Sequence, residues 1–124
     1  MRFNLRRGGA LDIDLALRVH ELVGWHTEVY ATDLPEHEVA LRELPRLCVD
    51  HLGMNAHGLA VAARLGAMVK ATPRHAADLA GLDPGRVLFG TDLPGTRSPR
   101  RFEPVDVQTA PLAADARAWY RVPA

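Results

Sequence analysis

The stretch RLCVDHLG, residues 46–53, decides the fold class predicted for this chain. It is a short apolar run that ends in two ionisable residues, Asp50 and His51, and is closed by Leu52-Gly53. A run of this length that stops at a glycine is typical of a buried strand. The stretch therefore predicts a strand whose carboxyl end carries groups able to do chemistry.

The same pattern, an apolar run that ends in polar or turn residues, recurs along the chain. The stretch RVLFGTDLPG, residues 86–95, is an apolar run that ends in Thr91 and Asp92 before a Pro-Gly turn. Three other runs have strand-like composition and end at turn residues. We therefore predict five strands, at Arg2–Arg7, Trp25–Ala31, Arg46–His51, Ala67–Thr72 and Arg86–Thr91.

Helical patterns fill the intervals between these runs. In the first interval, Leu15, Val19 and Leu22 recur at the spacing of one helix face, and Gly24 supplies a C-terminal stop. In the second, Asp33 is an acidic N-cap with a glutamate three residues later, followed by a helix to Leu44. Three more helices are predicted at Ala56–Leu65, His75–Ala80 and Ala113–Arg121. This alternation predicts an α/β fold with a parallel sheet, in one domain over residues 1–124.

Composition excludes several classes of function. The 124 residues are 48% hydrophobic and 24% charged, as in an ordinary globular domain. Their formal net charge is zero, so no long-range field would gather nucleic acid or anionic lipid. No apolar run approaches the roughly 20 residues of a membrane span, and the lone Cys48 fits a reducing compartment. We expect a cytoplasmic protein that acts on a small molecule, with no nucleic-acid or membrane partner.

Ligands of parallel α/β folds bind beyond the carboxyl ends of the strands. Because alternate strand residues share a face, His51 is predicted to lie on the face of Leu47 and Val49. By the same count, Lys70 shares a face with Met68, and Asp92 with Leu88. If these faces line a barrel, His51, Lys70 and Asp92 converge at its mouth. The polar residues at the predicted strand ends are Arg6, Arg7, Glu28, Tyr30, Asp50, His51, Lys70, Thr72, Thr91 and Asp92.

Each candidate also has a structural interpretation. His51 can be structural, with Asp50 capping the next turn, and Lys70 can extend its ammonium into solvent. Asp92 can cap the loop that follows it. Trp119 and Tyr120 are expected to pack the last helix. The other histidines lack ligand spacing and are expected at the surface or on helices: His20, His26, His37, His57 and His75.

Two of these stretches resemble motifs of amidohydrolase-related enzymes. Residues 47–53 resemble the fifth-strand DHxG signature, and residues 87–94 resemble the eighth-strand FGTDxP signature. Residues 68–70, 2–5 and 25–30 resemble the strand between those two, the third strand and the fourth strand. The resemblance implies a partial TIM-type (β/α)₈ barrel of about five β/α units, the C-terminal part of such a domain. Members include lactonases similar to 2-pyrone-4,6-dicarboxylate lactonase.

The resemblance implies roles for individual residues. Asp92 would be the general acid/base, and His51 would polarise the substrate carbonyl. His51 and Asp92 would also hold a divalent metal, zinc or manganese, if a first-strand His-x-His pair were supplied. Arg6 or Arg7 would bind a substrate carboxylate through bidentate hydrogen bonds, and Lys70 would also contact substrate.

The chain departs from the family pattern in ways that leave its function open. It contains no His-x-His pair, and only 15 residues separate Lys70 from Arg86, too few for a full helix, strand and helix. The implied function is a hydrolase of a lactone, ester or amide bond in a small carboxylate. The alternatives are an incomplete barrel segment that needs a missing half or a second copy, and a metal-dependent carboxy-lyase. For the chain alone we expect no bound metal, self-association and no turnover.

Overall fold

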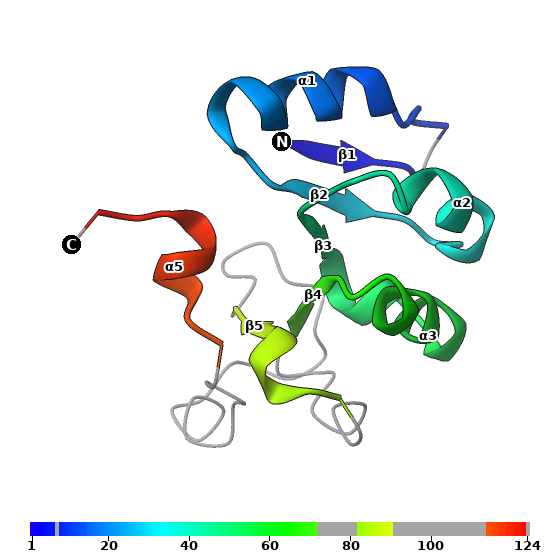
Figure 1. Ribbon diagram of the computed structural model, residues 1–124. Helices are drawn as coiled ribbons and strands as arrows, with labels where there is room; N and C mark the ends of the chain where they lie inside the picture. The colour runs from blue at the N-terminus through cyan, green and yellow to red at the C-terminus, as the bar shows by residue number, and fades with distance from the viewer. Residues whose placement is uncertain (7, 72–81, 91–113, 124) are drawn as a thin grey trace.

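A parallel five-stranded sheet forms the centre of the computed structural model (Figure 1), which describes residues 1–6, 8–71, 82–90 and 114–123. The strands lie in the order β1-β2-β3-β4-β5, so each is hydrogen-bonded to its neighbour in the sequence. This confirms the predicted α/β class and the parallel sheet. The strands are β1 (Arg2–Asn4), β2 (Thr27–Tyr30), β3 (Leu47–Val49), β4 (Met68–Ala71) and β5 (Val87–Phe89).

The helices follow the predicted intervals; α1 begins one residue earlier than predicted, at Ile13, and α2, α3 and α5 are shorter than predicted. Asp12 caps α1 by accepting from the Leu15 amide at 2.9 Å. Gly24 ends α1, as predicted, and lies in the left-handed conformation. The expected cap at Asp33 is wrong, because the turn there begins after Leu34 and has no side-chain cap. The helices are α1 (Ile13–Val23), α2 (Glu38–Leu41), α3 (Ala56–Arg64) and α5 (Ala116–Tyr120), with 3₁₀ turns η1 (Pro35–His37), η2 (Asp50–Gly53) and η4 (Pro84–Arg86). The helix predicted at His75–Ala80 lies outside the described residues.

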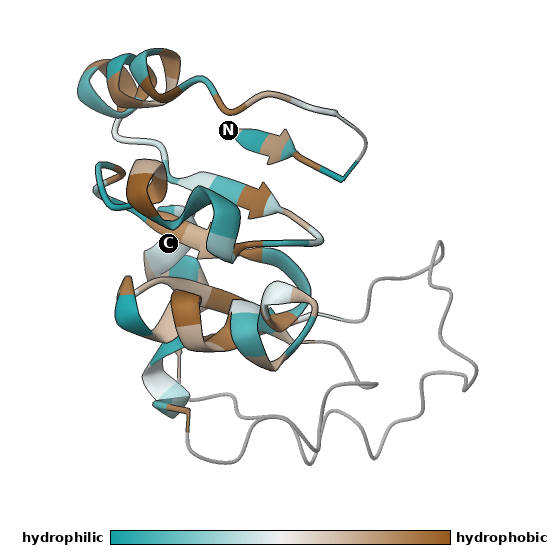
Figure 2. Cartoon of the chain, turned by 90° about the vertical axis from the view of Figure 1, so that its right-hand side faces the viewer, coloured by the Kyte–Doolittle hydropathy of each residue, from teal (hydrophilic) through white to brown (hydrophobic). Residues whose placement is uncertain are grey.

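One row of apolar residues crosses the whole sheet. The paired positions are Phe3, Val29, Val49, Val69 and Val87, one from each strand. These residues pack with side chains of α1, α2 and α3 in a single core cluster. Three helices therefore cover one face of the sheet, and Figure 2 looks onto this side, with α2 and α3 in front of the strands. Burial of this row, together with the helix side chains packed on it, stabilises the sheet through the hydrophobic effect.

The opposite face carries the polar residues. Glu28, Cys48 and Met68 are paired across it, and Lys70 is paired with Leu88. The predicted grouping of Leu47 and Val49 with Met68 and Leu88 is wrong, because Val49 is paired with Val69 in the helix-covered row. The assignment of alternate residues to one face failed because it treated His51 as a strand residue, whereas β3 ends at Val49.

The C-terminal helix α5 returns to this polar face. Tyr120 Oη donates to Glu28 Oε1 at 3.3 Å, which joins two residues 92 positions apart. Figure 1 shows α5 on the other side of the strands from α2 and α3. Among the described helices, none combines the length and the apolar character that a membrane crossing requires.

Candidate functional site

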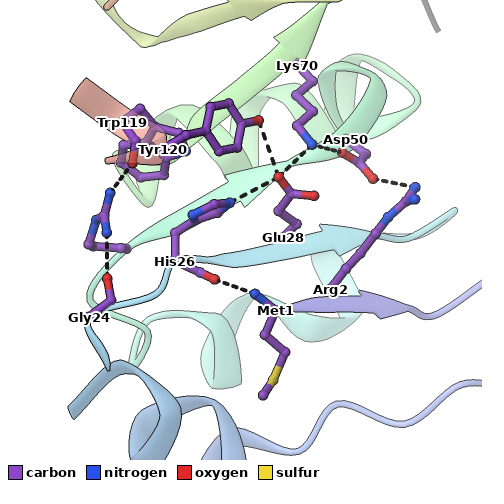
Figure 3. A network of polar contacts seen from close by, with 10 residues as sticks. Met1, Arg2, Gly24, His26, Glu28, Asp50, Lys70, Trp119 and Tyr120 are labelled. Atoms are coloured by element: carbon purple, nitrogen blue, oxygen red, sulfur yellow. Dashed lines mark hydrogen bonds and ion pairs between the residues drawn. The ribbon is translucent and has the colours of Figure 1, made fainter. Parts of the chain in front are cut away.

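A network of charged side chains lies on the polar face of the sheet (Figure 3). Lys70 Nζ lies 2.6 Å from Glu28 Oε1 and 3.4 Å from Asp50 Oδ1. Arg2 Nη2 lies 2.7 Å from Asp50 Oδ2. The network thus alternates acid and base across four elements, β2, β4, η2 and β1. Such alternation lets each charge compensate the desolvation of the next.

The pKa values of this network follow from burial and pairing. Burial alone would lower the pKa of Lys70, but its hydrogen bond to Glu28 and the charges of Asp50 and Glu28 raise it. Burial opposes ionisation of Glu28, yet hydrogen bonds from Lys70 and His26 leave its pKa lowered. Lys70 is therefore a fixed cation at neutral pH, suited to holding an anion and not to removing a proton.

His26 completes this network, which the sequence did not predict. Its Nε2 lies 3.0 Å from Glu28 Oε1, and its side chain is 16% exposed, so the expected surface location is wrong. Its ring centroid lies 5.1 Å from that of Tyr120 and 5.4 Å from that of Trp119. Two-residue spacing from Glu28 on an extended segment was the only sequence signal that could have linked this pair.

The loop after β3 presents His51 in an unusual backbone conformation. His51 and Leu52 have φ of 50° and 51°, in the left-handed region that few non-glycine residues adopt. Gly53 follows with φ of +71°, and a Cβ there would lie 2.5 Å from the backbone carbon of Gly58. The amide of Met54 closes the turn by donating to His51 O at 2.9 Å. Strain of this kind is often concentrated at functional sites.

A pocket of about 280 Å³ opens at the carboxyl ends of the strands. We call it the strand-end pocket. His51 lies on its wall with Tyr30 behind it, the two ring centroids being 5.1 Å apart. The lining residues are Arg2, Asp50, His51, Lys70, Ala71, Leu88, Phe89, Gly90, Ala116 and Tyr120.

The predicted site residues divide into three groups. His51 and Lys70 both line the strand-end pocket, although His51 arrives through the η2 loop and not through strand alternation. Arg6 is exposed and donates from Nη1 to Tyr30 Oη at 2.6 Å, and among the described arginines it is Arg2 that lines the pocket. Arg7 and Asp92, assigned to substrate and to catalysis, lie outside the described residues.

The described donors do not fit a metal ion. Asp50 lies beside His51 in the chain, but both of its carboxylate oxygens are paired with cations, Arg2 and Lys70. A divalent cation at Asp50 would be repelled by both of them. Over the described ranges, no three His, Cys, Asp or Glu side chains are grouped to bind a metal.

Comparison with protein-family models, curated proteins and solved structures found no match to this chain. The resemblance of residues 47–53 and 87–94 to the amidohydrolase-related enzymes therefore remains a prediction.

Proposed function

We propose that the strand-end pocket belongs to a hydrolase of the amidohydrolase-related type, acting on a lactone, ester or amide bond of a small carboxylate. The observation that carries this proposal is the meeting of His51, Lys70 and Arg2 around one pocket at the carboxyl ends of parallel strands. In parallel α/β enzymes this end of the sheet is where substrates bind.

The charges of the pocket suit a substrate carboxylate. Arg2 uses one Nη group for Asp50, and its side chain is 54% exposed, which leaves other N–H groups for a ligand. Lys70 adds a cation whose raised pKa keeps it charged. Arg2 and Lys70 would hold the carboxylate, while His51 donates to the oxygen of the scissile carbonyl.

Asp92 is proposed as the general base. It would accept a proton from water as the hydroxide adds to the carbonyl carbon, and would return that proton to the leaving oxygen or nitrogen as its bond to carbon breaks. Gly90, two residues before Asp92, lines the strand-end pocket, which supports this assignment.

A second candidate is a barrel segment that is active only after completion by a partner. The observation that favours it is that β1 and β5, within the described residues, each pair with one strand only. Open parallel edges are sites at which further strands can add. A missing barrel half or a second copy would fill them and would complete the walls of the pocket.

The two proposals are tested together by assaying small lactones, esters and carboxylate amides. The chain alone is expected to be inactive, and a fusion that adds the strands carrying a His-x-His pair is expected to turn over at least one lactone. In the fusion, His51→Ala is expected to lower kcat by about 10²–10³-fold, since one carbonyl-polarising donor is lost.

The matched control is His57→Ala, which removes an exposed histidine from α3. It should leave kcat unchanged. Turnover by the unfused chain would refute the need for completion. A fusion that folds but hydrolyses none of the panel, or that keeps full activity as Asp92→Asn, would refute the assigned chemistry.

A further inference from the structure

A second pocket, of about 290 Å³, opens at the other end of the sheet. Trp25 and His26 line it just before β2 begins, and Arg46 lines it just before β3. Trp119 and Arg121 line it from α5. We call it the basic-aromatic pocket. Figure 3 shows Trp119 and Gly24 at the end of the polar network that lies away from Asp50.

Two guanidinium groups converge in this pocket on one residue, Gly24. Arg46 donates from Nη1 to Gly24 O at 2.6 Å, and its second Nη group donates to Trp119 O. A Cβ placed on Gly24 would lie 2.0 Å from Arg121 Nη1, so the Arg121 guanidinium lies directly against the Gly24 backbone. Neither carbonyl carries a charge that could neutralise the two arginines.

Among the described residues, no acidic side chain lines this pocket. Burial, followed by the charge of Arg121, lowers the pKa of Arg46. The nearby Glu28 carboxylate is hydrogen-bonded to His26 and Tyr120. Its negative charge is already paired with Lys70, whose Nζ lies 2.6 Å from Glu28 Oε1. Two like charges held together in a pocket repel each other unless an anion joins them.

The aromatic part of the lining adds a further feature. The guanidinium carbon of Arg46 lies 4.6 Å from the centroid of the Trp119 ring. The Trp119 Nε1 is buried and has no hydrogen-bond acceptor within the described part of the chain. A buried N–H without an acceptor costs free energy. Trp25 is 59% exposed beside it and offers a flat apolar surface.

We infer that the basic-aromatic pocket binds a small aromatic oxyanion, whose phosphate or carboxylate group bridges Arg46 and Arg121 while its ring packs on tryptophan. The volume is near the lower end of the range of small-molecule sites, about 300–1,000 Å³, which fits a one-ring ligand. The site lies at the opposite end of the strands from the strand-end pocket and does not depend on the proposed hydrolase activity.

Binding there would also fix the C-terminal helix. Arg46 precedes β3, whereas Arg121 ends α5, so an oxyanion between them ties α5 to the sheet. Because α5 supplies Tyr120 and Ala116 to the strand-end pocket, the ligand would stabilise one wall of that pocket from outside.

Tryptophan fluorescence can test the inference directly, because the chain has two tryptophans and both line this pocket. The probes are phenyl phosphate, benzoate, inorganic phosphate and phenol. Phenyl phosphate or benzoate is expected to change the emission saturably and to raise Tm. Inorganic phosphate should bind at least about tenfold more weakly than phenyl phosphate, since it lacks the ring. Phenol should not bind.

Arg121→Gln is expected to weaken binding of the tightest-binding probe by about tenfold, because one charged hydrogen bond is lost. The control is Arg117→Gln, which removes an equal charge from the same helix but bonds Pro123 O and does not line the pocket. Trp25→Phe should reduce the emission change while Trp119 still reports binding. Saturable binding that is weakened about tenfold in Arg121→Gln but not in Arg117→Gln supports the inference. Equal weakening in both arginine variants, or no saturable change with any probe, overturns it.

Discussion

The two faces of the sheet are built from alternate residues of the same strands, yet they differ in nearly every physical property. On the helix-covered face, Val29, Val49 and Val69 are between 0% and 3% exposed. On the other face, Glu28 and Lys70 carry charge and are covered in part by α5. One face is therefore stabilised by apolar burial, and the other combines buried Cys48 and Leu88 with paired charges.

This difference separates the residues that stabilise the fold from the residues that form the strand-end pocket. Apolar contacts are insensitive to pH and lose stability with buried volume, whereas charged pairs depend on pH and on each partner. Substitutions on the helix-covered face should therefore change stability alone. Substitutions on the polar face should change the strand-end pocket and its pH dependence as well.

The largest effect is expected from the helix-covered core. Leu41 of α2 is 1% exposed, so Leu41→Ala should lower the free energy of unfolding by about 2–5 kcal/mol. The matched control on the same helix is Val39→Ala, because Val39 is 77% exposed and its loss should cost less than about 0.5 kcal/mol. Urea denaturation measures both. Similar losses for the two variants would mean that α2 does not pack as described.

A smaller effect is expected from the polar face. Lys70→Met leaves Glu28 and Asp50 without their shared cation and should lower the free energy of unfolding by about 1–3 kcal/mol. A double-mutant cycle with Glu28→Gln should give a coupling of about 0.5–1.5 kcal/mol, in the lower half of the usual range because Lys70 is partly exposed. Arg18→Met on the exposed side of α1 is the control for loss of one charge. A cycle with zero coupling would argue against the ion pair.

The smallest effect concerns pH and an ion pair on the helix side. Hydrogen bonds from Arg64 and Arg42 lower the pKa of Glu38 to about 2. A carboxyl group with a lowered pKa contributes stability above its ordinary pKa of about 4.5 and loses it as pH falls towards 2. Glu38→Gln should therefore be less stable than the parent at pH 7 and equal to it near pH 2. Thermal melts across this range measure the difference.

The control for that series is Glu36→Gln, which removes an exposed carboxylate two residues earlier. Its stability difference from the parent should be smaller at pH 7. A difference in thermal stability between Glu38→Gln and the parent that persists unchanged at pH 2 would exclude the ion pairs with Arg42 and Arg64 as its cause.

Periodicity and turn residues were enough to predict the order of elements, because each strand is a local apolar run that stops at a polar or turn residue. The rule that ligands bind at the carboxyl ends of parallel strands placed His51 and Lys70 near one another, although the face count for His51 was wrong. These rules failed for Leu47 and Val49, since nothing in local spacing shows that β3 ends before the left-handed turn at His51. They also could not find contacts such as Tyr120 with Glu28, which depend on how α5 packs across 92 positions of sequence.

The strand order has a consequence for how the chain assembles. Because every strand pairs with its predecessor, each β/α unit can add to the sheet as soon as the unit before it has formed, without waiting for distant sequence. Among the described residues, α5 is an exception, since Trp119 and Tyr120 contact Arg46 and Glu28, which lie 73 and 92 positions earlier in the chain. The apolar core can therefore form early and from one end, while the polar face is covered only after α5 has been made.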